Sequence, residues 1–415
     1  MAYRELKKFY YESNERYAQE YMSRFNSEDA VKINFQIGEY QAFFVQTVDV
    51  MRLAFEIAKL DKTIEKLYRE LPGVAIQQYS KKCLIDEIVI TNKIEGVHSS
   101  RKEIGEALDV LETQSQSRGR RQRFLSLVNK YLKLIQKEKI VLSDCEDVRK
   151  IYDEIFLEEV VREDPENKPD GKLFRKDIVT VHSETDKVIH TGLMPEEKII
   201  DSMTAALNFL NDDTIEPLFK ICLFHYLIEY IHPFYDGNGR LGRFILSYGI
   251  SNTLTPLIAF RLSETIKENI KEYYKAFATC NDQRNLGDLT PFLLMQLNVI
   301  LTAMKELEKS LMEKVITWNK YEAVIEKRCS NIELLRMYSF LIQAALFSEK
   351  GISMAELQQN MNCSQYIIKN LMKQIPEDMM IVQMKHKYKF YSINLEKLNA
   401  IMLEESIESL KTAEG

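Results

Sequence analysis

Apolar residues recur at helical spacing through most of this 415-residue chain. Within residues 1–150 the amphipathic repeat is clearest from Val50 to Leu67 and from Lys81 to Lys93. Two later runs, Pro195 to Phe209 and Pro217 to Tyr230, have the same helical character. Because only 9 prolines and 14 glycines interrupt the sequence, long helices are favoured over many short strands. The pattern predicts a mainly α-helical protein.

The pattern changes within residues 174–191. Two runs rich in Val, Ile and Thr, Asp177 to His182 and Lys187 to Thr191, flank the polar segment Ser183 to Asp186. Strand-forming runs joined by a polar turn are typical of a β-hairpin. We therefore expect a hairpin here, between helical segments.

The last third of the chain begins with a long helical stretch, Asn298 to Lys327, that lacks loop signals and is typical of a connecting arm. Three helical and two strand-like runs follow, at Ile332–Leu346, Met354–Met361, Gln365–Lys373, Met379–Met384 and Lys387–Tyr391. This order resembles a winged helix, in which a helix-turn-helix precedes a hairpin wing.

Five lysines would give the recognition helix and the wing some positive charge: Lys369, Lys373, Lys385, Lys387 and Lys389. The negative charges of Glu377 and Asp378 oppose it. DNA binding is one interpretation, and a scaffold, dimerisation or substrate-docking role is the other, because a fold does not establish a function. The arginine-rich segment Ser115 to Arg123 leaves a similar choice between a phosphate or nucleic-acid contact and a solvated loop.

Composition narrows the class of protein. The length suggests two or three domains, and 45% hydrophobic with 28% charged residues is ordinary for a globular protein. A net charge of −6 argues against a nucleic-acid footprint over the whole surface. Six scattered cysteines without a C-x-x-C pair indicate reduced thiols and a cytoplasmic location. The charged N-terminus and the absence of a long uncharged apolar stretch predict neither a signal peptide nor a membrane span.

The most informative segment runs from His232 to Arg243. The small residues Gly237–Gly239 tolerate backbone angles that point successive N–H groups into one concavity, which is an anion nest. The run that follows predicts a helix whose N-terminus adds the positive end of its dipole to the nest. Arg240 and Arg243 are three residues apart and can reach the same side of the first turn, where guanidinium groups match phosphate oxygens.

A base and a carboxylate belong to the same segment. His232 is the side chain best suited to take a proton near neutral pH. Asp236 opens the nest, and a carboxylate within a phosphate cradle is best explained as a ligand of the Mg²⁺ that accompanies a nucleoside triphosphate. His182 and His190 lack a nearby third ligand, so we expect ordinary strand residues there and not a metal site.

The pattern His232-Pro233-Phe234-x-Asp236-Gly237-Asn238-Gly239-Arg240-x-x-Arg243 resembles the complete signature of the Fic family. Proteins of this kind transfer AMP from ATP to a side-chain hydroxyl of a protein and release pyrophosphate. The resemblance implies that His232 deprotonates a Tyr, Ser or Thr hydroxyl and that Asp236 holds Mg²⁺. It also implies that a buried Phe234 anchors the loop and that ATP binds at Gly237, Asn238, Gly239, Arg240, Leu241, Gly242 and Arg243.

The resemblance extends beyond the signature. The expected hairpin 174–191 resembles the Fic flap, which holds the target segment, and an exposed strand edge can receive such a segment by β-augmentation. Glu272 to Tyr274 resembles a downstream family helix near the adenine. There Tyr273 or Tyr274 could stack on the base, or either could pack in the core. Self-modification and homo-oligomer formation are further expectations.

A second motif lies upstream, at Thr91 to Gly96. Thr91 and Glu95 are four residues apart and face the same way on a helix, which Gly96 would end. The segment resembles the autoinhibitory motif of the Fic family. By that resemblance Glu95 pairs with Arg243 and occupies the guanidinium that should hold the γ-phosphate. A carboxylate and a phosphate cannot share one such group, because like charges repel.

These observations divide the chain into an N-terminal helical region 1–150 with the inhibitory motif 91–96, a Fic catalytic core 151–300 with flap 174–191 and signature 232–243, a linker helix 301–330, a winged-helix-like domain 331–395 and a tail 396–415. The expected function is that of a protein adenylyltransferase restrained by Glu95. Removal of AMP or transfer of another phosphate-linked group is one alternative. A nucleotide-sensing DNA-binding regulator is another, but a sensor would need no base such as His232.

Overall fold

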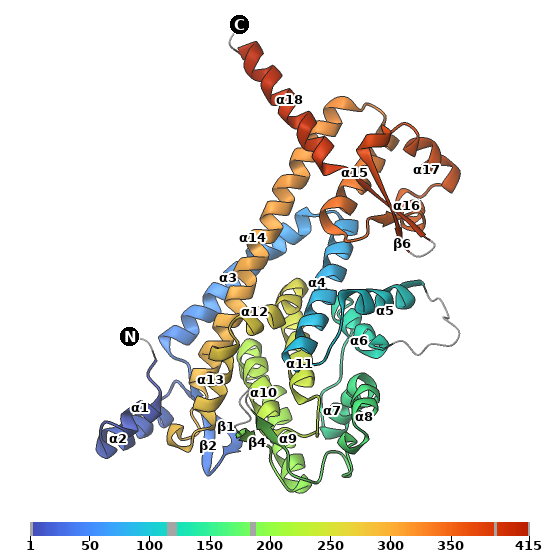
Figure 1. Ribbon diagram of the computed structural model, residues 1–415. Helices are drawn as coiled ribbons and strands as arrows, with labels where there is room; N and C mark the ends of the chain where they lie inside the picture. Colours follow the sequence, from blue (N-terminus) through green and yellow to red (C-terminus); the bar gives the residue numbers. More distant parts are fainter. Residues whose placement is uncertain (1–2, 114–122, 183–187, 386–387, 414–415) are drawn as a thin grey trace. The chain divides into compact units, whose positions relative to one another are not determined.

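The structure, a computed structural model, describes residues 3–113, 123–182, 188–385 and 388–413. It is mainly helical, as predicted (Figure 1). The chain forms two compact units, one made of Met1–Lys62 and Leu84–Lys305 and the other of Thr63–Cys83 and Glu306–Gly415. The expected turn Ser183–Asp186, residue Lys387 and most of the segment Ser115–Arg123 lie outside the described residues.

The first 150 residues are not helical throughout, and the prediction of an all-helical region there is wrong. After α1 (Leu6–Tyr10) and α2 (Asn14–Phe25), the antiparallel strands β1 (Ala30–Ile37) and β2 (Tyr40–Val45) form a hairpin. Its inward positions on β1 alternate with exposed ones, as the pleat of a strand requires. That period of two, in Ile33, Phe35 and Ile37, was the signal available in the sequence.

Helices make up most of the remaining elements up to residue 328: α3 (Val48–Glu70), α4 (Gly73–Ile94), α5 (Arg101–Thr113), α6 (Leu125–Ile135), α7 (Cys145–Tyr152), α8 (Glu158–Glu163), α9 (Glu196–Leu210), α10 (Pro217–Ile231), α11 (Asn238–Thr253), α12 (Leu262–Glu268), α13 (Ile270–Asn281) and α14 (Thr290–Arg328). Short 3-10 or π turns lie at Asp153–Leu157, Pro165–Asn167, Pro256–Arg261 and Gln283–Asn285. Strands β3 (Thr180–His182) and β4 (Val188–Thr191) form the expected hairpin. No described helix combines the length and the apolar character needed to cross a membrane.

Helix α10 is almost entirely buried within the first unit. It is apolar on every side, and 12 of its 15 residues are buried, as is typical of a helix surrounded by others. Pro217 begins it at a position where the missing N–H costs nothing. Helices α9 and α11 pack against it. The residue that follows its last turn, His232, therefore starts from a rigid part of the core.

The second unit contains every helix and strand expected in residues 331–395: α15 (Ile332–Phe347), α16 (Met354–Met361), α17 (Gln365–Met372), β6 (Met380–Lys385) and β7 (Tyr388–Ile393). A short strand, β5 (Ile352–Ser353), adds to β7 and gives a sheet of order β5-β7-β6. The expected tail forms helix α18 (Leu395–Ala413). Ser353 and Glu356 form a reciprocal capping box at the start of α16.

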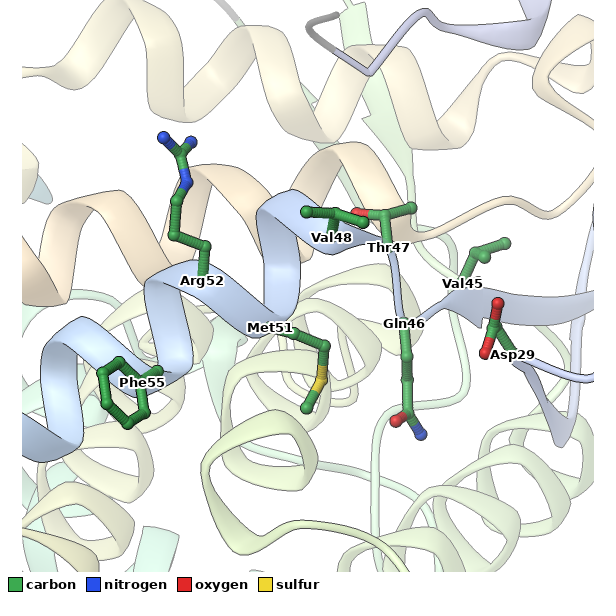
Figure 2. A pocket seen from close by; sticks show the side chains of 8 residues that line it. All are labelled: Asp29, Val45, Gln46, Thr47, Val48, Met51, Arg52 and Phe55. Carbon is green, nitrogen blue, oxygen red and sulfur yellow. The ribbon is translucent and has the colours of Figure 1, made fainter.

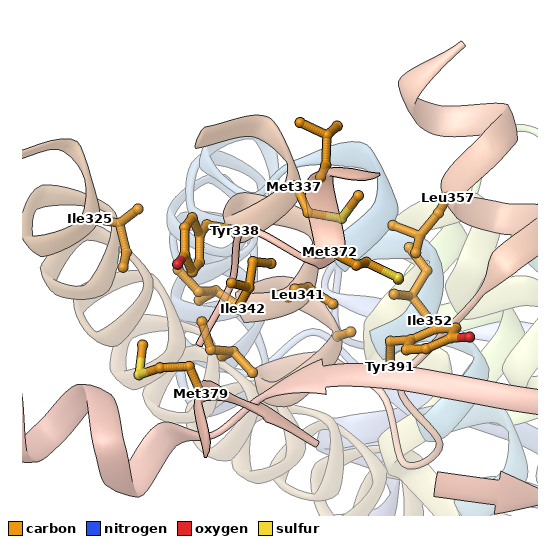
Figure 3. Close-up of a cluster of buried hydrophobic side chains, with 14 of the residues drawn as sticks. Ile325, Met337, Tyr338, Leu341, Ile342, Ile352, Leu357, Met372, Met379 and Tyr391 are labelled. Carbon is orange, nitrogen blue, oxygen red and sulfur yellow. The ribbon is translucent and has the colours of Figure 1, made fainter. Parts of the chain in front are cut away.

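The core of this second unit is shown in Figure 3. Side chains from α15, α16, α17 and the sheet meet there, among them the fully buried Leu341. Trp318, the chain's one tryptophan, belongs to the same cluster. Its fluorescence therefore reports on the unfolding of this core.

We expect Leu341→Ala to lower the free energy of unfolding of the second unit by about 2–5 kcal/mol, because it removes a buried side chain and leaves a cavity. Urea titrations followed by Trp318 fluorescence measure the change. Leu403→Ala is the matched control, because Leu403 is 62% exposed. Equal effects of the two substitutions would contradict the assignment of Leu341 to the core.

Candidate functional site

His232 lies directly after α10 in a left-handed backbone conformation, with φ of 53°. Its N–H closes the helix by donating to the Ile228 carbonyl at 2.9 Å. Its ring Nδ1 lies 3.3 Å from the Glu229 carbonyl oxygen. Because a carbonyl only accepts, Nδ1 carries the hydrogen, and Nε2 keeps a free lone pair. Burial, reinforced by the neighbouring His190, lowers the pKa of His232 to about 4. The imidazole is therefore a neutral base near pH 7.

The loop after His232 is held by internal packing. Phe234 is fully buried, and its ring stacks on that of Tyr152 with 3.6 Å between centroids. The Asn238 side chain accepts from the Phe234 N–H at 2.9 Å and donates to the Phe234 carbonyl at 2.8 Å. Gly237 takes the left-handed conformation, with φ of 82°, that begins α11. The polar atoms of Asn238 thus shape the loop and leave its main chain as the part that could face a phosphate.

Glu95 lies directly over the start of α11. A Cβ added to Gly239 would overlap the Glu95 carboxylate, so glycine is needed for this approach. The first N–H groups of a helix lack partners within the helix and attract anions. The Glu95 side chain is still 27% exposed. A carboxylate therefore lies at a helix start of the kind that attracts anions, and it remains partly exposed to solvent.

The same carboxylate pairs with Arg243, so the structure brings together two motifs that are far apart in sequence. Arg243 Nη2 donates to Glu95 Oε1 at 2.8 Å. Arg243 Nε donates to Thr91 Oγ1 at 2.8 Å, and Nη2 also reaches the Thr91 carbonyl at 3.2 Å. Gly96, at φ of 73°, ends this segment. Desolvation alone would raise the pKa of Glu95, but the Arg243 guanidinium outweighs it and lowers that pKa.

Arg240 is buried beside the nest and has donors to spare. Its Nη1 donates to Glu159 Oε2 at 3.1 Å, and its Nη2 lies 3.7 Å from Asp236 Oδ2. Its Nε and Nη2 have no hydrogen-bond partner among the described residues. A buried N–H without a partner is costly. These donors are therefore suited to an anionic ligand.

Two of the residues expected to bind ATP also have packing roles. Leu241 has a fully buried side chain, and its N–H donates to the Gly237 carbonyl at 3.0 Å. Gly242 lets α11 approach α10, because a Cβ there would overlap Glu229 Oε1. Burial, followed by the negative charge of Glu95, raises the pKa of Glu229 to about 8. Glu229 is therefore neutral near pH 7 and does not add a negative charge to the site.

The two candidate tyrosines of α13 differ in exposure. Tyr273 is buried, and its hydroxyl lies 2.7 Å from His225 Nε2. Tyr274 is 40% exposed. Of the two alternatives left by the sequence, core packing applies to Tyr273, and Tyr274 is the one with an exposed ring.

Several site residues were not found from the sequence, because their partners are distant along the chain. Glu159 binds Arg240 and also accepts from Arg123 Nη2 at 2.6 Å. Arg175 is fully buried against the His232 carbonyl. His190 places its Nε2 2.7 Å from the Tyr230 carbonyl oxygen, so it ties β4 to α10. No local pattern marks any of these residues.

Asp236 is the residue of this loop that could hold a metal ion. Within the described ranges, no group of three or more His, Cys, Asp or Glu residues could hold an ion by itself. Asp236 is 37% exposed at the edge of the nest and accepts from the Gly237 N–H at 2.5 Å. Mg²⁺ commonly binds through one or two carboxylates and completes its shell with phosphate oxygens and water. A single carboxylate near the start of α11 has the chemistry that such an ion requires.

A separate hollow lies at the start of α3 (Figure 2). Its lining residues include none of those described above: Asp29, Val45, Gln46, Thr47, Val48, Met51, Arg52 and Phe55. It lacks a base, a nest and a paired arginine cluster. We therefore assign the candidate chemistry to the loop after α10 and not to this hollow.

We expect the His232 imidazole to titrate near pH 4 in the folded protein, well below the ordinary value of 6.5. NMR of the ring protons, assigned with His232→Ala, measures the midpoint. Because the unfolded chain binds this proton more readily, the free energy of unfolding contributed by His232 is lost as the pH falls from about 6.5 to 4. A midpoint near 6.5 would show that the ring is solvated.

Residues 142–248 match the Fic/DOC family model. Protein adenylyltransferase fic-1 of Caenorhabditis elegans is 31% identical over 100 residues, which are 23% of this chain and 18% of that protein. A probable protein adenylyltransferase of Aquifex aeolicus, aq_aa38, is 40% identical over 62 residues, 15% of this chain and 19% of that protein. The matched part of the chain thus spans about a fifth of the length of these relatives.

Among solved structures, a Fic family protein from Desulfovibrio desulfuricans has a similar fold, with a TM-score of 0.51 at 20% identity. The similarity covers 86% of this chain and 98% of that one. At this identity the likeness concerns the fold alone. The match to the family model covers α9, α10 and most of α11, and therefore His232, the loop that follows it and Arg243 on α11. The chain thus contains a Fic/DOC family domain on a mainly helical fold.

Proposed function

We propose that this protein transfers AMP from ATP to a side-chain hydroxyl of a protein substrate, and that Glu95 restrains the reaction. The observation that carries the proposal is the position of the Glu95 carboxylate, over Gly239 and 2.8 Å from Arg243. That carboxylate marks an anion site at the start of a helix. The distant relatives named as protein adenylyltransferases support ATP as the source of the anion.

The triphosphate would lie along the start of α11. The unpartnered Nε and Nη2 of buried Arg240 offer two donors to phosphate oxygens. Arg243 would offer the guanidinium N–H donors that now bind Glu95. The main chain of Gly237 to Gly239 would lie against the innermost phosphate. Asp236 would hold Mg²⁺, whose chemistry is to neutralise charge on the phosphates.

His232 has the protonation state that a general base needs in the transfer step. His232 Nε2 would take the proton of a Tyr, Ser or Thr hydroxyl while that oxygen attacks the α-phosphorus. The bond between the α-phosphorus and the bridging oxygen breaks, and pyrophosphate leaves with the electron pair. A neutral imidazole is the form this step requires, and general base catalysis contributes roughly 10²–10⁴-fold. Positioning and charge neutralisation supply the rest.

The hairpin β3–β4 supports a peptide as the acceptor. Its strands pair with each other, and the described residues add no third strand to this sheet. An extended segment can add to the edge of such a sheet through main-chain hydrogen bonds, which require little of the added sequence. We propose that the hydroxyl is presented in this way, either from another protein or from a second copy of this chain.

The restraint by Glu95 is a competition for one guanidinium. While Arg243 is paired with Glu95 and Thr91, it cannot hold a γ-phosphate. A triphosphate that enters regardless would meet the negative Glu95 over Gly239 and would be turned away from in-line geometry. Loss of the carboxylate alone should therefore increase the rate.

We expect Glu95→Gly to raise the rate of AMP transfer, including self-transfer, by about tenfold or more, since ~1.4 kcal/mol of lost competition corresponds to a factor of ten. The protein is incubated with ATP and Mg²⁺, and intact mass is measured for a gain equal to AMP. Glu39→Gly, at an exposed turn residue between β1 and β2, is the matched control. No mass gain in either protein would exclude self-transfer, and unchanged labelling by Glu95→Gly would remove the inhibitory role.

In the Glu95→Gly background, His232→Ala should abolish transfer and leave the affinity for ATP within about threefold, because the base contacts the acceptor and not the phosphates. Isothermal titration with ATP and Mg²⁺ measures the affinity, and intact mass measures transfer. His98→Ala is the control. It removes another histidine side chain but keeps the main-chain carbonyl of residue 98, to which Arg123 donates. Transfer that persists in His232→Ala would show that another group is the base.

A further inference from the structure

The hairpin β3–β4 needs support from outside itself. Within the described residues it is a two-stranded sheet of short strands, and an isolated hairpin of this size is marginally stable in water. If it presents an acceptor hydroxyl, its distance from His232 must nevertheless be well defined. Contacts that fix this distance are therefore required where the two strands of the hairpin join the rest of the chain.

Arg175, which precedes the hairpin, is bound there by three main-chain carbonyls. Its Nε donates to the His232 carbonyl at 2.8 Å. Its Nη1 donates to the Asp177 carbonyl at 2.5 Å, just before β3, and its Nη2 to the Leu193 carbonyl at 2.8 Å, just after β4. The Arg175 side chain thus joins both ends of the hairpin to His232, whose imidazole is the proposed proton acceptor.

The guanidinium acts here by its shape. The ion pairs formed by the described residues include none with Arg175, and its side chain is fully buried. A guanidinium holds its donors in a fixed plane, whereas a lysine ammonium is a single point on a flexible stem. Lysine therefore could not bind three carbonyls in this arrangement.

The surrounding main chain closes on Arg175. The Gly192 N–H donates to the Val179 carbonyl at 2.9 Å, and the Leu193 N–H donates to the Ile231 carbonyl at 3.1 Å. A Cβ on Gly192 would overlap Arg175 Nη2. The same Cβ would also come within 3.0 Å of the His232 Cβ. Glycine at 192 therefore allows the hairpin base, the guanidinium and the catalytic loop to meet.

We propose that Arg175 is a positioning residue that sets the distance between the hairpin and the His232 imidazole, and thereby the alignment of an acceptor hydroxyl for attack. This inference rests on the proposed transferase function and names a residue through which the acceptor is placed. A displacement of about 1 Å at a reacting centre can lower a rate by on the order of 10²-fold. Binding of ATP depends on other residues and should not change.

The test compares Arg175→Lys with its parent in the Glu95→Gly background. We expect the rate of self-transfer at saturating ATP to fall by about 10- to 100-fold, while the ATP concentration at half-maximal rate stays within about twofold. Arg149→Lys is the matched control. Arg149 donates to the Leu173 carbonyl at 2.8 Å and to Asp153, and its hydrogen bonds among the described residues include none to the hairpin or to His232.

Amide hydrogen exchange provides a second readout that does not depend on activity. The amides of Gly192 and Leu193 should exchange faster in Arg175→Lys than in the parent, and the amides of α10 should not. If Arg175→Lys does not fold, Gly192→Ala displaces the same guanidinium from the hairpin side. It should likewise lower the maximal rate of self-transfer and leave the half-maximal ATP concentration unchanged.

A transfer rate equal to that of the parent, or unchanged exchange at Gly192 and Leu193, would overturn the role of Arg175. A rise in the half-maximal ATP concentration with an unchanged maximal rate would overturn it as well, because it would place Arg175 in nucleotide binding. If the Glu95→Gly parent transfers no AMP to itself, self-transfer is excluded and the rate comparison cannot be made. In that case the exchange comparison alone decides whether Arg175 ties the hairpin to the loop.

Discussion

The candidate site depends on the burial of α10. A helix without a polar face is stable only when other helices surround it, and α9 and α11 pack against this one. The chain leaves α10 at His232 and enters α11 at Asn238, six residues later, so both ends of the loop are fixed by the core. The stacking of Phe234 on Tyr152 fixes its middle. A base with a defined direction and a helix N-terminus beside it follow from this one packing constraint.

Two buried guanidinium groups then determine the electrostatics. Arg240 and Arg243 are each almost fully buried, and a buried charge requires a counter-charge. Glu159 provides it for Arg240 and Glu95 for Arg243. The two arrangements differ, because Glu159 is buried while Glu95 remains partly exposed. We therefore assign the proposed restraint to Glu95, because displacing a partly exposed carboxylate by an incoming anion costs less free energy than displacing a buried one.

The hairpin β3–β4 is related to the same loop through main-chain atoms. Arg175 binds the His232 carbonyl and both ends of the hairpin, and His190 binds the Tyr230 carbonyl. Carbonyl acceptors are provided by every residue type, so such a connection leaves little trace in the sequence around it. The proposed acceptor surface and the proposed base are thus joined by contacts that depend on backbone position.

Local chemistry was predictable from the sequence. The pattern from His232 to Arg243 contains its own glycines, helix start and charged groups, and the period of the apolar residues predicts α9 and α10, because each of these signals depends on near neighbours. The β1–β2 hairpin was not predicted, although apolar and polar residues alternate along β1. The helical spacing of the flanking segments favoured a helix there as well. Only the tertiary structure decided that Glu159 faces Arg240, that Arg175 faces His232 and that the polar atoms of Asn238 turn inward. These contacts join residues on different elements, and their energy depends on burial and distance, which no local pattern encodes.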